Sequence, residues 1–242
     1  MKQGTYNTIR HWDENIVFKF VKKELNELCG HLEKYDMKEF SFIDIGGNVG
    51  KFYDELSKKY FVKKCEIVEA CNFLCEYMND KFKDNPNVVV HNLGLSDEEG
   101  VFYFGDEGIR WFEENDQDGT GQEVNLGLSA SNFVRHDNTD YPGATKFYTS
   151  GRFLERINRI PPHEIAFIKV DTENRDVQIV SGMTDYLAKN NIRPIILFEN
   201  NFRYFLSAEQ AQKLIDDICE KVGYEPVDLL NSQDNIFLLP KK

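Results

Sequence analysis

A strand, a glycine-rich turn and a helix follow one another directly near the start of the chain. The apolar run Phe40–Ile45 predicts a buried strand, and the turn after it reads Gly46-Gly-Asn-Val-Gly50. Glycines in such a turn let the backbone bend sharply and approach a ligand closely. Because a helix begins at once, its free N–H groups face the same place. This arrangement favours an open α/β sheet with a ligand site beside this strand.

The same alternation of strands and helices continues along the chain. Strands are expected at 65–69, 88–92, 101–104, 165–170, 194–199, 224–228 and 236–239, and helices at 51–60, 72–82, 152–160, 172–190 and 208–222. Such alternation predicts a parallel, doubly wound sheet with helices on both faces. One of the two closing strands is expected to be antiparallel, because a hairpin demands it.

Two segments lie outside this alternation. Between Asp13 and Glu39, apolar residues recur every three or four positions, which predicts a helix with Asp13 as its N-cap. We therefore expect a helical extension over 1–39 that packs on a domain over 40–242. Within that domain the pattern stops from about 105 to 150, in a stretch rich in Gly, Asp, Asn, Ser and Thr. A patternless insert of that length is usually functional or disordered.

The charge and composition of the chain indicate which classes of binding partner to expect. The 242 residues include 29 Lys and Arg against 41 Asp and Glu, a net charge of −12. This charge repels phosphate backbones and anionic lipid, so neither nucleic acid nor a membrane surface is an expected partner. No apolar run approaches the roughly 20 residues of a membrane span. A polar start and five cysteines without a CxxC pair favour reduced thiols in the cytoplasm.

Acidic residues at the ends of two strands distinguish between cofactors. Asp44 would place a carboxylate beside a pyrophosphate, and the turn is not GxGxxG, so NAD is disfavoured. A carboxylate there suits the ammonium group of an amino acid, whereas Glu69 can accept both hydroxyls of a ribose. These features together predict S-adenosylmethionine, with its adenine near 92–97. The expected cofactor-binding residues are Asp44, Gly46, Gly47, Asn48, Gly50, Glu69, Ala70, Asn92, Leu95 and Asp171.

An ordered set of motifs resembles a known family. The motifs are Phe42-Ile-Asp-Ile-Gly-Gly-Asn-Val-Gly50, Val68-Glu-Ala70, Asn92-Leu-Gly-Leu-Ser-Asp97, Ile168-Lys-Val-Asp-Thr-Glu173 and Pro194-Ile-Ile-Leu-Phe-Glu199. In this order they resemble the FkbM family of S-adenosylmethionine-dependent methyltransferases over about residues 40–240. The resemblance implies a Rossmann-like class I methyltransferase fold, with a seven-stranded, mostly parallel sheet and one antiparallel strand. It also implies O-methylation of a hydroxyl on a sugar or other small metabolite.

Three carboxylates at strand ends are candidates for the general base of such a reaction. Asp171 ends one strand, Glu173 lies two residues further on, and Glu199 ends the next strand. An alcohol loses its proton as it attacks a methyl group, and a nearby carboxylate can accept that proton. Asp171 is the first choice, with contact to the cofactor as its alternative role. Glu173 has the alternative of a helix N-terminal charge, and Glu199 that of a structural hydrogen-bonding group.

Several alternatives stay open from the sequence. Oxygen ligands from Asp171, Glu199 and Asn200 would suit Mg²⁺. The first expectation, however, is a site without a metal. His136 and His163 are either near the acceptor or surface imidazoles. The 105–150 insert is expected to form part of the acceptor site. The acceptor itself could instead be a protein or a nucleic-acid end, and a non-catalytic binding module with the same fold is a third hypothesis.

Overall fold

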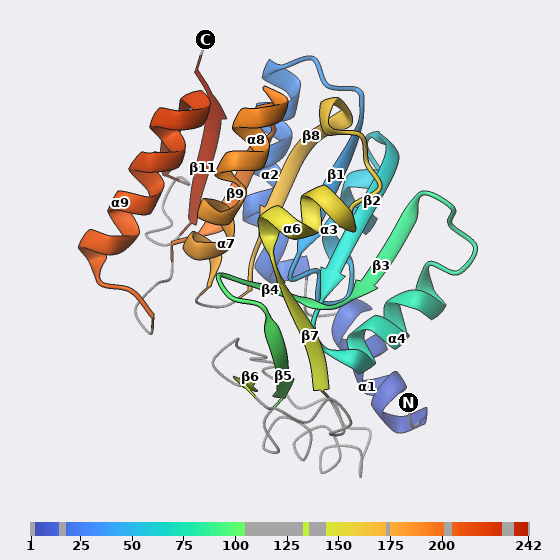
Figure 1. Cartoon of the computed structure of the whole chain (residues 1–242). Coiled ribbons are helices and arrows are strands. Elements are labelled where there is room, and N and C mark those ends of the chain that lie inside the picture. The colour runs from blue at the N-terminus through green and yellow to red at the C-terminus, as the bar shows by residue number, and fades with distance from the viewer. Residues whose placement is uncertain are drawn as a thin grey trace.

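A seven-stranded sheet forms the centre of the molecule (Figure 1). The computed structural model describes residues 3–14, 18–104, 133–135, 144–172, 175–200, 205–228 and 235–241. Within these residues the strand order is β10-β11-β9-β8-β1-β2-β3, and β11 runs antiparallel to both of its neighbours. The strands are β1 (Glu39–Ile45), β2 (Phe61–Glu69), β3 (Val88–Asn92), β8 (Ile165–Val170), β9 (Ile195–Glu199), β10 (Tyr224–Asp228) and β11 (Asn235–Pro240). The predicted fold class and the antiparallel closing strand are confirmed.

Helices bury both faces of this sheet, which is why its central strands are apolar almost throughout. Phe42 pairs with Phe167 on one face, and the next residues, Ile43 and Ile168, pair on the other. The first face packs on α2 (Phe18–Lys34), α3 (Lys51–Ser57) and α4 (Asn72–Lys81). The second face packs on α6 (Ser150–Arg156), α7 (Asp176–Gly182), α8 (Thr184–Asn190) and α9 (Ala208–Ile218). Figure 1 shows the two layers, with α6 to α9 toward the viewer.

The strand order reverses at β1, which lies between β2 and β8. From β1 the chain proceeds to one side through β2 and β3, and later returns to build the other side from β8. At such a point the connecting segments diverge, and ligands of open α/β sheets bind at the carboxyl ends of the strands. The predicted cofactor turn follows β1 and therefore lies at this position.

A second, four-stranded sheet joins β4 (Gly94–Ser96), β7 (Ala144–Thr149), β5 (Gly100–Phe104) and β6 (Phe133–Arg135) in that order. The expectation of a patternless insert over 105–150 is thus wrong for 133–135 and 144–149. These strands form through pairings that are distant in sequence, such as Leu95 with Tyr148, so local patterns do not reveal them. Residues 105–132 and 136–143, with most of the predicted insert, lie outside the described residues.

The N-terminal part forms two helices rather than the single helix predicted over 13–39. Helix α1 spans Gln3–Trp12 and α2 spans Phe18–Lys34. Asp13 directly follows α1, so it is not the N-cap of the helix that carries the predicted apolar face. That face itself is correct, because Leu25, Leu28 and Leu32 are buried. The predicted helix over 172–190 is likewise divided, into α7 and α8. In the described part of the chain, no helix is long and apolar enough to cross a membrane.

Candidate active site

The glycine-rich turn after β1 is held tightly between β2 and β8. The N–H groups of Gly46 and Gly47 both donate to the Val68 carbonyl, at 2.9 and 3.1 Å. Gly46 has φ of +73°, and a Cβ on it would lie 1.8 Å from the Asp171 carbonyl oxygen. Gly50 has φ of +74°, and a Cβ on it would lie 2.5 Å from the Phe82 ring. The sequence therefore needs glycine at both positions for this turn to form.

Glu69, at the carboxyl end of β2, connects the turn with the start of α4. Its Oε2 accepts the Asn48 N–H at 2.9 Å, and its Oε1 accepts the Cys71 N–H at 2.8 Å. Burial raises the pKa of Glu69 to about 7, although these two N–H groups oppose the shift. Each carboxylate oxygen has two lone pairs, so both oxygens keep acceptor capacity for a further donor. The predicted ribose ligand is thus fixed in orientation and still able to accept two hydroxyls.

The predicted adenine region lies beside Glu69. The Asn92 side chain donates to the backbone carbonyls of Glu69 and Ala70, at 3.4 and 3.3 Å. The Thr145 hydroxyl donates to the same Ala70 carbonyl at 2.8 Å, which attaches β7 of the second sheet to this edge. Leu95 belongs to β4 (Gly94–Ser96) and is buried in the core. Sequence analysis did not single out Thr145, because its partner is 75 positions away.

Asp44 and Asp171 meet at one buried lysine that sequence analysis did not single out. Asp44 is only 1% exposed, and burial raises its pKa. The Lys169 ammonium lies 3.4 Å from Asp44 Oδ1 and 3.3 Å from Asp171 Oδ2. The Asp171 side chain is 42% exposed, so it has an open side as well as this buried contact. Lys169 could have been found from its position, two residues before Asp171 in an otherwise apolar strand, which places both side chains on one face.

Helix α2 adds a further carboxylate to this edge. Glu24 accepts a hydrogen bond from the Asn235 side chain at 2.9 Å, and Asn235 is the register partner of Glu199. Burial and then the charge of Asp171 raise the pKa of Glu24 to about 7. Because β8 and β9 are parallel neighbours, Asp171 and Glu199 both lie at the carboxyl ends of these strands. Glu24 was missed because its helix precedes the domain in sequence.

Three other residues predicted from the sequence are not found at the site in the described part of the chain. Glu173 and His136 lie outside the described residues. His163 is in the short helix before β8, at the amino end of that strand and therefore away from the site. Among the described residues, no group of three or more His, Cys, Asp or Glu side chains is arranged to hold a metal ion. The five cysteines are free thiols.

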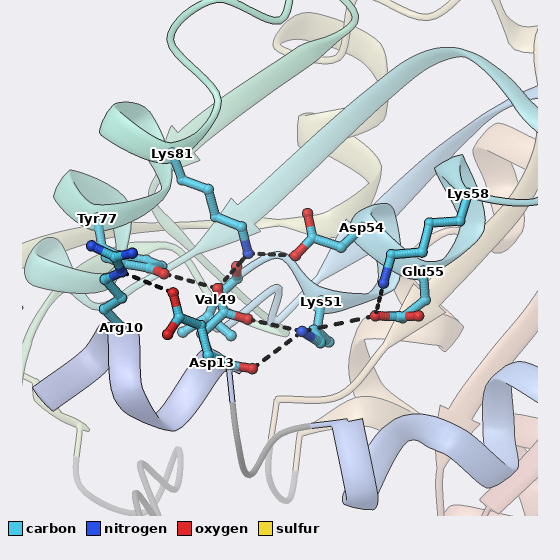
Figure 2. Close-up of polar contacts among 10 residues, drawn as sticks. Arg10, Asp13, Val49, Lys51, Asp54, Glu55, Lys58, Tyr77 and Lys81 are labelled. Carbon is cyan, nitrogen blue, oxygen red and sulfur yellow. Dashed lines mark hydrogen bonds and ion pairs between the residues drawn. The ribbon is translucent and has the colours of Figure 1, made fainter. Parts of the chain in front are cut away.

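Asp13 ties the N-terminal segment to the outer side of the turn (Figure 2). Its carboxylate lies 2.6 Å from the Lys81 ammonium and 3.3 Å from that of Lys51, and it accepts the Tyr77 hydroxyl at 2.8 Å. Lys81 also donates to the Val49 carbonyl within the turn, at 2.8 Å. Asp13 itself is 4% exposed. The buried carboxylate therefore joins α1, α3, α4 and the turn through charge-assisted hydrogen bonds.

Replacing Asp13 by alanine is expected to lower the free energy of unfolding by about 2 kcal/mol, because two lysines lose a buried anionic partner. The loss stays below that of a fully buried pair, since Lys81 keeps Asp54 at 2.5 Å. Urea titration measures the effect. As a control, Glu33→Ala removes an exposed ion pair with Lys59 and is expected to change stability by about 0.5 kcal/mol or less. Equal losses in the two variants would contradict a structural role for Asp13.

The chain is similar to known proteins in its structure but not in its sequence. No family model and no curated protein matches the chain. The methyltransferase FkbM from Methylobacillus flagellatus is similar in structure, with a TM-score of 0.50 and 10% sequence identity; the match covers 84% of this chain and 44% of that one. The chain thus spans less than half the length of that protein. The N-methyltransferase NodS from Bradyrhizobium japonicum matches with a TM-score of 0.46 and 10% identity, over 94% of this chain and 99% of that one.

The first of these matches is a likeness of fold. The sheet reverses at β1, its strand β11 is antiparallel, and the glycine turn follows β1 at the carboxyl edge. These features also agree with what the sequence motifs imply. The chain has the Rossmann-like fold of class I S-adenosylmethionine-dependent methyltransferases.

Proposed function

We propose that the chain is an S-adenosylmethionine-dependent methyltransferase of the FkbM family that methylates a hydroxyl group on a sugar or other small metabolite. The observation that carries this proposal is the Glu69 carboxylate, which the N–H groups of Asn48 and Cys71 fix beside the glycine turn. A fixed carboxylate with spare lone pairs suits the two hydroxyls of a ribose. Beside it, the Asp171 carbonyl fills the place where a Gly46 side chain would lie, so the turn packs directly against the end of β8.

Buried polar atoms in the turn also fit the amino-acid part of the cofactor. Neither carboxylate oxygen of Asp44 has a well-aligned hydrogen bond within the described residues, and neither does Asn48 Oδ1. Buried acceptors of this kind are costly without a donor, which the ammonium group of the cofactor would supply. In this proposal Asp44, Gly46, Gly47, Asn48 and Gly50 hold the amino-acid part. Glu69 and Ala70 hold the ribose, and Asn92 with Leu95 borders the adenine.

When bound, the cofactor supplies an already activated methyl group, so the chain has to orient the acceptor and manage its proton. Asp171 suits this task, because its carboxylate is partly exposed at the carboxyl end of β8. Glu199, at the end of the neighbouring strand, and Glu173 are the alternatives. We also propose that the segment over 105–150 completes the acceptor site, because Thr145 in its strand β7 donates to the Ala70 carbonyl. A cytoplasmic location belongs to the same proposal and is supported by the five free thiols.

Calorimetric titration with S-adenosylmethionine, S-adenosylhomocysteine and NAD tests the cofactor. We expect binding of the first two and none of NAD. Glu69→Ala is expected to weaken binding by about 1.5–3 kcal/mol, the contribution of a hydrogen bond to a charged group. Binding of NAD alone would overturn the proposal. Transfer of a labelled methyl group to sugars and other small metabolites, to a protein extract or to RNA then identifies the acceptor class. Transfer to protein or RNA alone would contradict the proposed acceptor.

The affinity for S-adenosylmethionine is expected to rise with pH through about 7. Ribose hydroxyls donate best to the charged carboxylate, and the pKa of free Glu69 is about 7. Its ionised form therefore predominates above that value and is lost below it. We expect affinity to fall by about threefold to tenfold from pH 8 to pH 6, and binding at the lower pH to release a proton. Glu69→Gln should bind weakly but with affinity that no longer changes over this range. A pH-independent wild type would show that Glu69 does not hold the ribose.

A further inference from the structure

Lys169 is a buried cation at the centre of the candidate site, and none of the roles assigned above uses it. It is 3% exposed, although it belongs to a strand whose other residues are apolar. Its ammonium donates to the Gly46 carbonyl at 3.1 Å and contacts the carboxylates of Asp44 and Asp171. It also lies 5.1 Å from the centre of the Phe52 ring, at the start of α3. One side chain thus contacts a residue near the end of β1, the residue after β8 and the turn itself.

Carboxylates face this ammonium from several elements. Burial lowers the pKa of Lys169, but the charges of Asp171, Asp44 and Glu24 raise it by more, so the lysine is charged. Lys169 in turn lowers the pKa of neighbouring acids that burial raises, among them Asp44 and Glu69. The acidic groups around it are Asp44 from β1, Glu69 from β2, Asp171 after β8, Glu24 from α2 and Asp176 from α7.

We propose that Lys169 is a positioning residue of the cofactor site, which keeps Asp44 ionised and holds the Gly46 carbonyl and the Asp171 carboxylate in place. The inference rests on the proposed function, because Asp44 and Gly46 are the residues assigned to the amino-acid part of the cofactor. A buried carboxylate without a cation takes up a proton rather than stay charged. Lys169 supplies that cation before any cofactor arrives, so the site is charged and ordered in advance.

Removing the lysine charge therefore has a specific consequence for binding. In Lys169→Met, Asp44 is left buried without its cation and becomes protonated. The cofactor's ammonium then meets a neutral group, and Asp44 has to release its proton before it can pair with that ammonium. Binding becomes weaker and coupled to proton release. Lys169→Arg keeps the charge and is expected to behave much more like the wild type, whereas a purely packing role would be served equally well by methionine.

The test is calorimetric titration with S-adenosylhomocysteine near pH 8.5, where Glu69 is already ionised, in two buffers of different ionisation enthalpy. Lys169→Met is expected to bind at least about tenfold more weakly and to release about one proton per ligand, whereas the wild type and Lys169→Arg release almost none. Adding Asp44→Asn to Lys169→Met should abolish the proton release. Lys189→Met, at an exposed ion pair with Glu155, is the matched control and should bind normally.

A second measurement needs no ligand. The pKa of Asp44 in folded Lys169→Met lies further above its unfolded value than in the wild type, so the variant should lose stability as pH rises from about 4 to 8. Urea titration at both ends of this range measures that change. Unchanged affinity, or weaker binding without proton release and without this pH-dependent loss, would overturn the proposal. A wild type that binds no S-adenosylhomocysteine would overturn the proposed function. The ligand-free measurement, made on Lys169→Met with and without Asp44→Asn, still decides whether Lys169 keeps Asp44 charged.

Discussion

Asp171→Asn is expected to lower turnover by about 10²–10⁴-fold, the range for a lost general base, with little change in the affinity for S-adenosylmethionine. Asp171 follows β8, its side chain is 42% exposed, and its Oδ2 lies 3.3 Å from the buried Lys169 ammonium. The open side of its carboxylate is therefore available to an acceptor hydroxyl. Asparagine keeps the shape and the hydrogen-bonding reach but cannot accept the proton.

Single-turnover kinetics at saturating cofactor measure this effect, with the acceptor that the labelled-methyl screen identifies. Asp185→Asn makes the same change on the exposed face of α8 and should leave turnover unchanged. If Asp171→Asn chiefly weakens cofactor binding while turnover at saturation survives, Asp171 is a cofactor ligand. The proton would then pass to Glu199 or Glu173, for which the corresponding glutamine variants provide the test.

Gly46→Ala is expected to destabilise the protein by about 2–4 kcal/mol and to abolish measurable cofactor binding. A Cβ at this position would lie 1.8 Å from the Asp171 carbonyl oxygen, and that atom belongs to the backbone. Overpacking of this kind costs about 1–3 kcal/mol, and the left-handed backbone at φ of +73° adds about 1 kcal/mol for a residue with a side chain. The turn would have to move away from β8, which separates Gly46 from Lys169 as well.

The same substitution elsewhere in the chain provides a matched control. Gly30 lies in α2, and a Cβ there would meet no atom within 4 Å. Gly30→Ala is therefore expected to stabilise the protein by about 0.5–1 kcal/mol, since alanine restricts the unfolded chain and favours the helix. Thermal unfolding and calorimetry on both variants measure the contrast. Normal cofactor binding by Gly46→Ala would show that the close approach of turn and strand is not needed.

The positions that could be predicted from the sequence are those that follow from local order, whereas the roles of these residues stay predictions. Gly46, Gly50 and Glu69 each lie where a strand ends and a turn or helix begins, and parallel strands bring those ends to one edge. Lys169 and Glu24 were missed because their importance depends on three-dimensional neighbours. The position of Lys169 in an apolar strand marks it as unusual, but its contact with Asp44 appears only when β1 lies beside β8. A glutamate on a helix gives no sign of burial until β11 adds Asn235.

Two predictions failed for different reasons. Asp13 has the residue type of an N-cap, but its carboxylate is instead used by Lys51 and Lys81, which come from α3 and α4. Contacts between distant segments override the local preference in that case. Strand β7 was missed although four of its six residues favour strands, because it lies in a polar stretch and its partners β4 and β5 are distant in sequence. The catalytic carboxylate stays a prediction, because the sequence places three candidates at the same edge.

The hydrogen bond between Asn235 and Glu24 has a consequence for how the protein is made. The two residues are 211 positions apart, so their contact waits until almost the whole described chain has left the ribosome. At synthesis rates of about 5–20 residues per second, this interval lasts roughly 10–40 s. During that time helix α2 stands without this partner, so the Glu24 carboxylate stays uncovered while the rest of the domain is made.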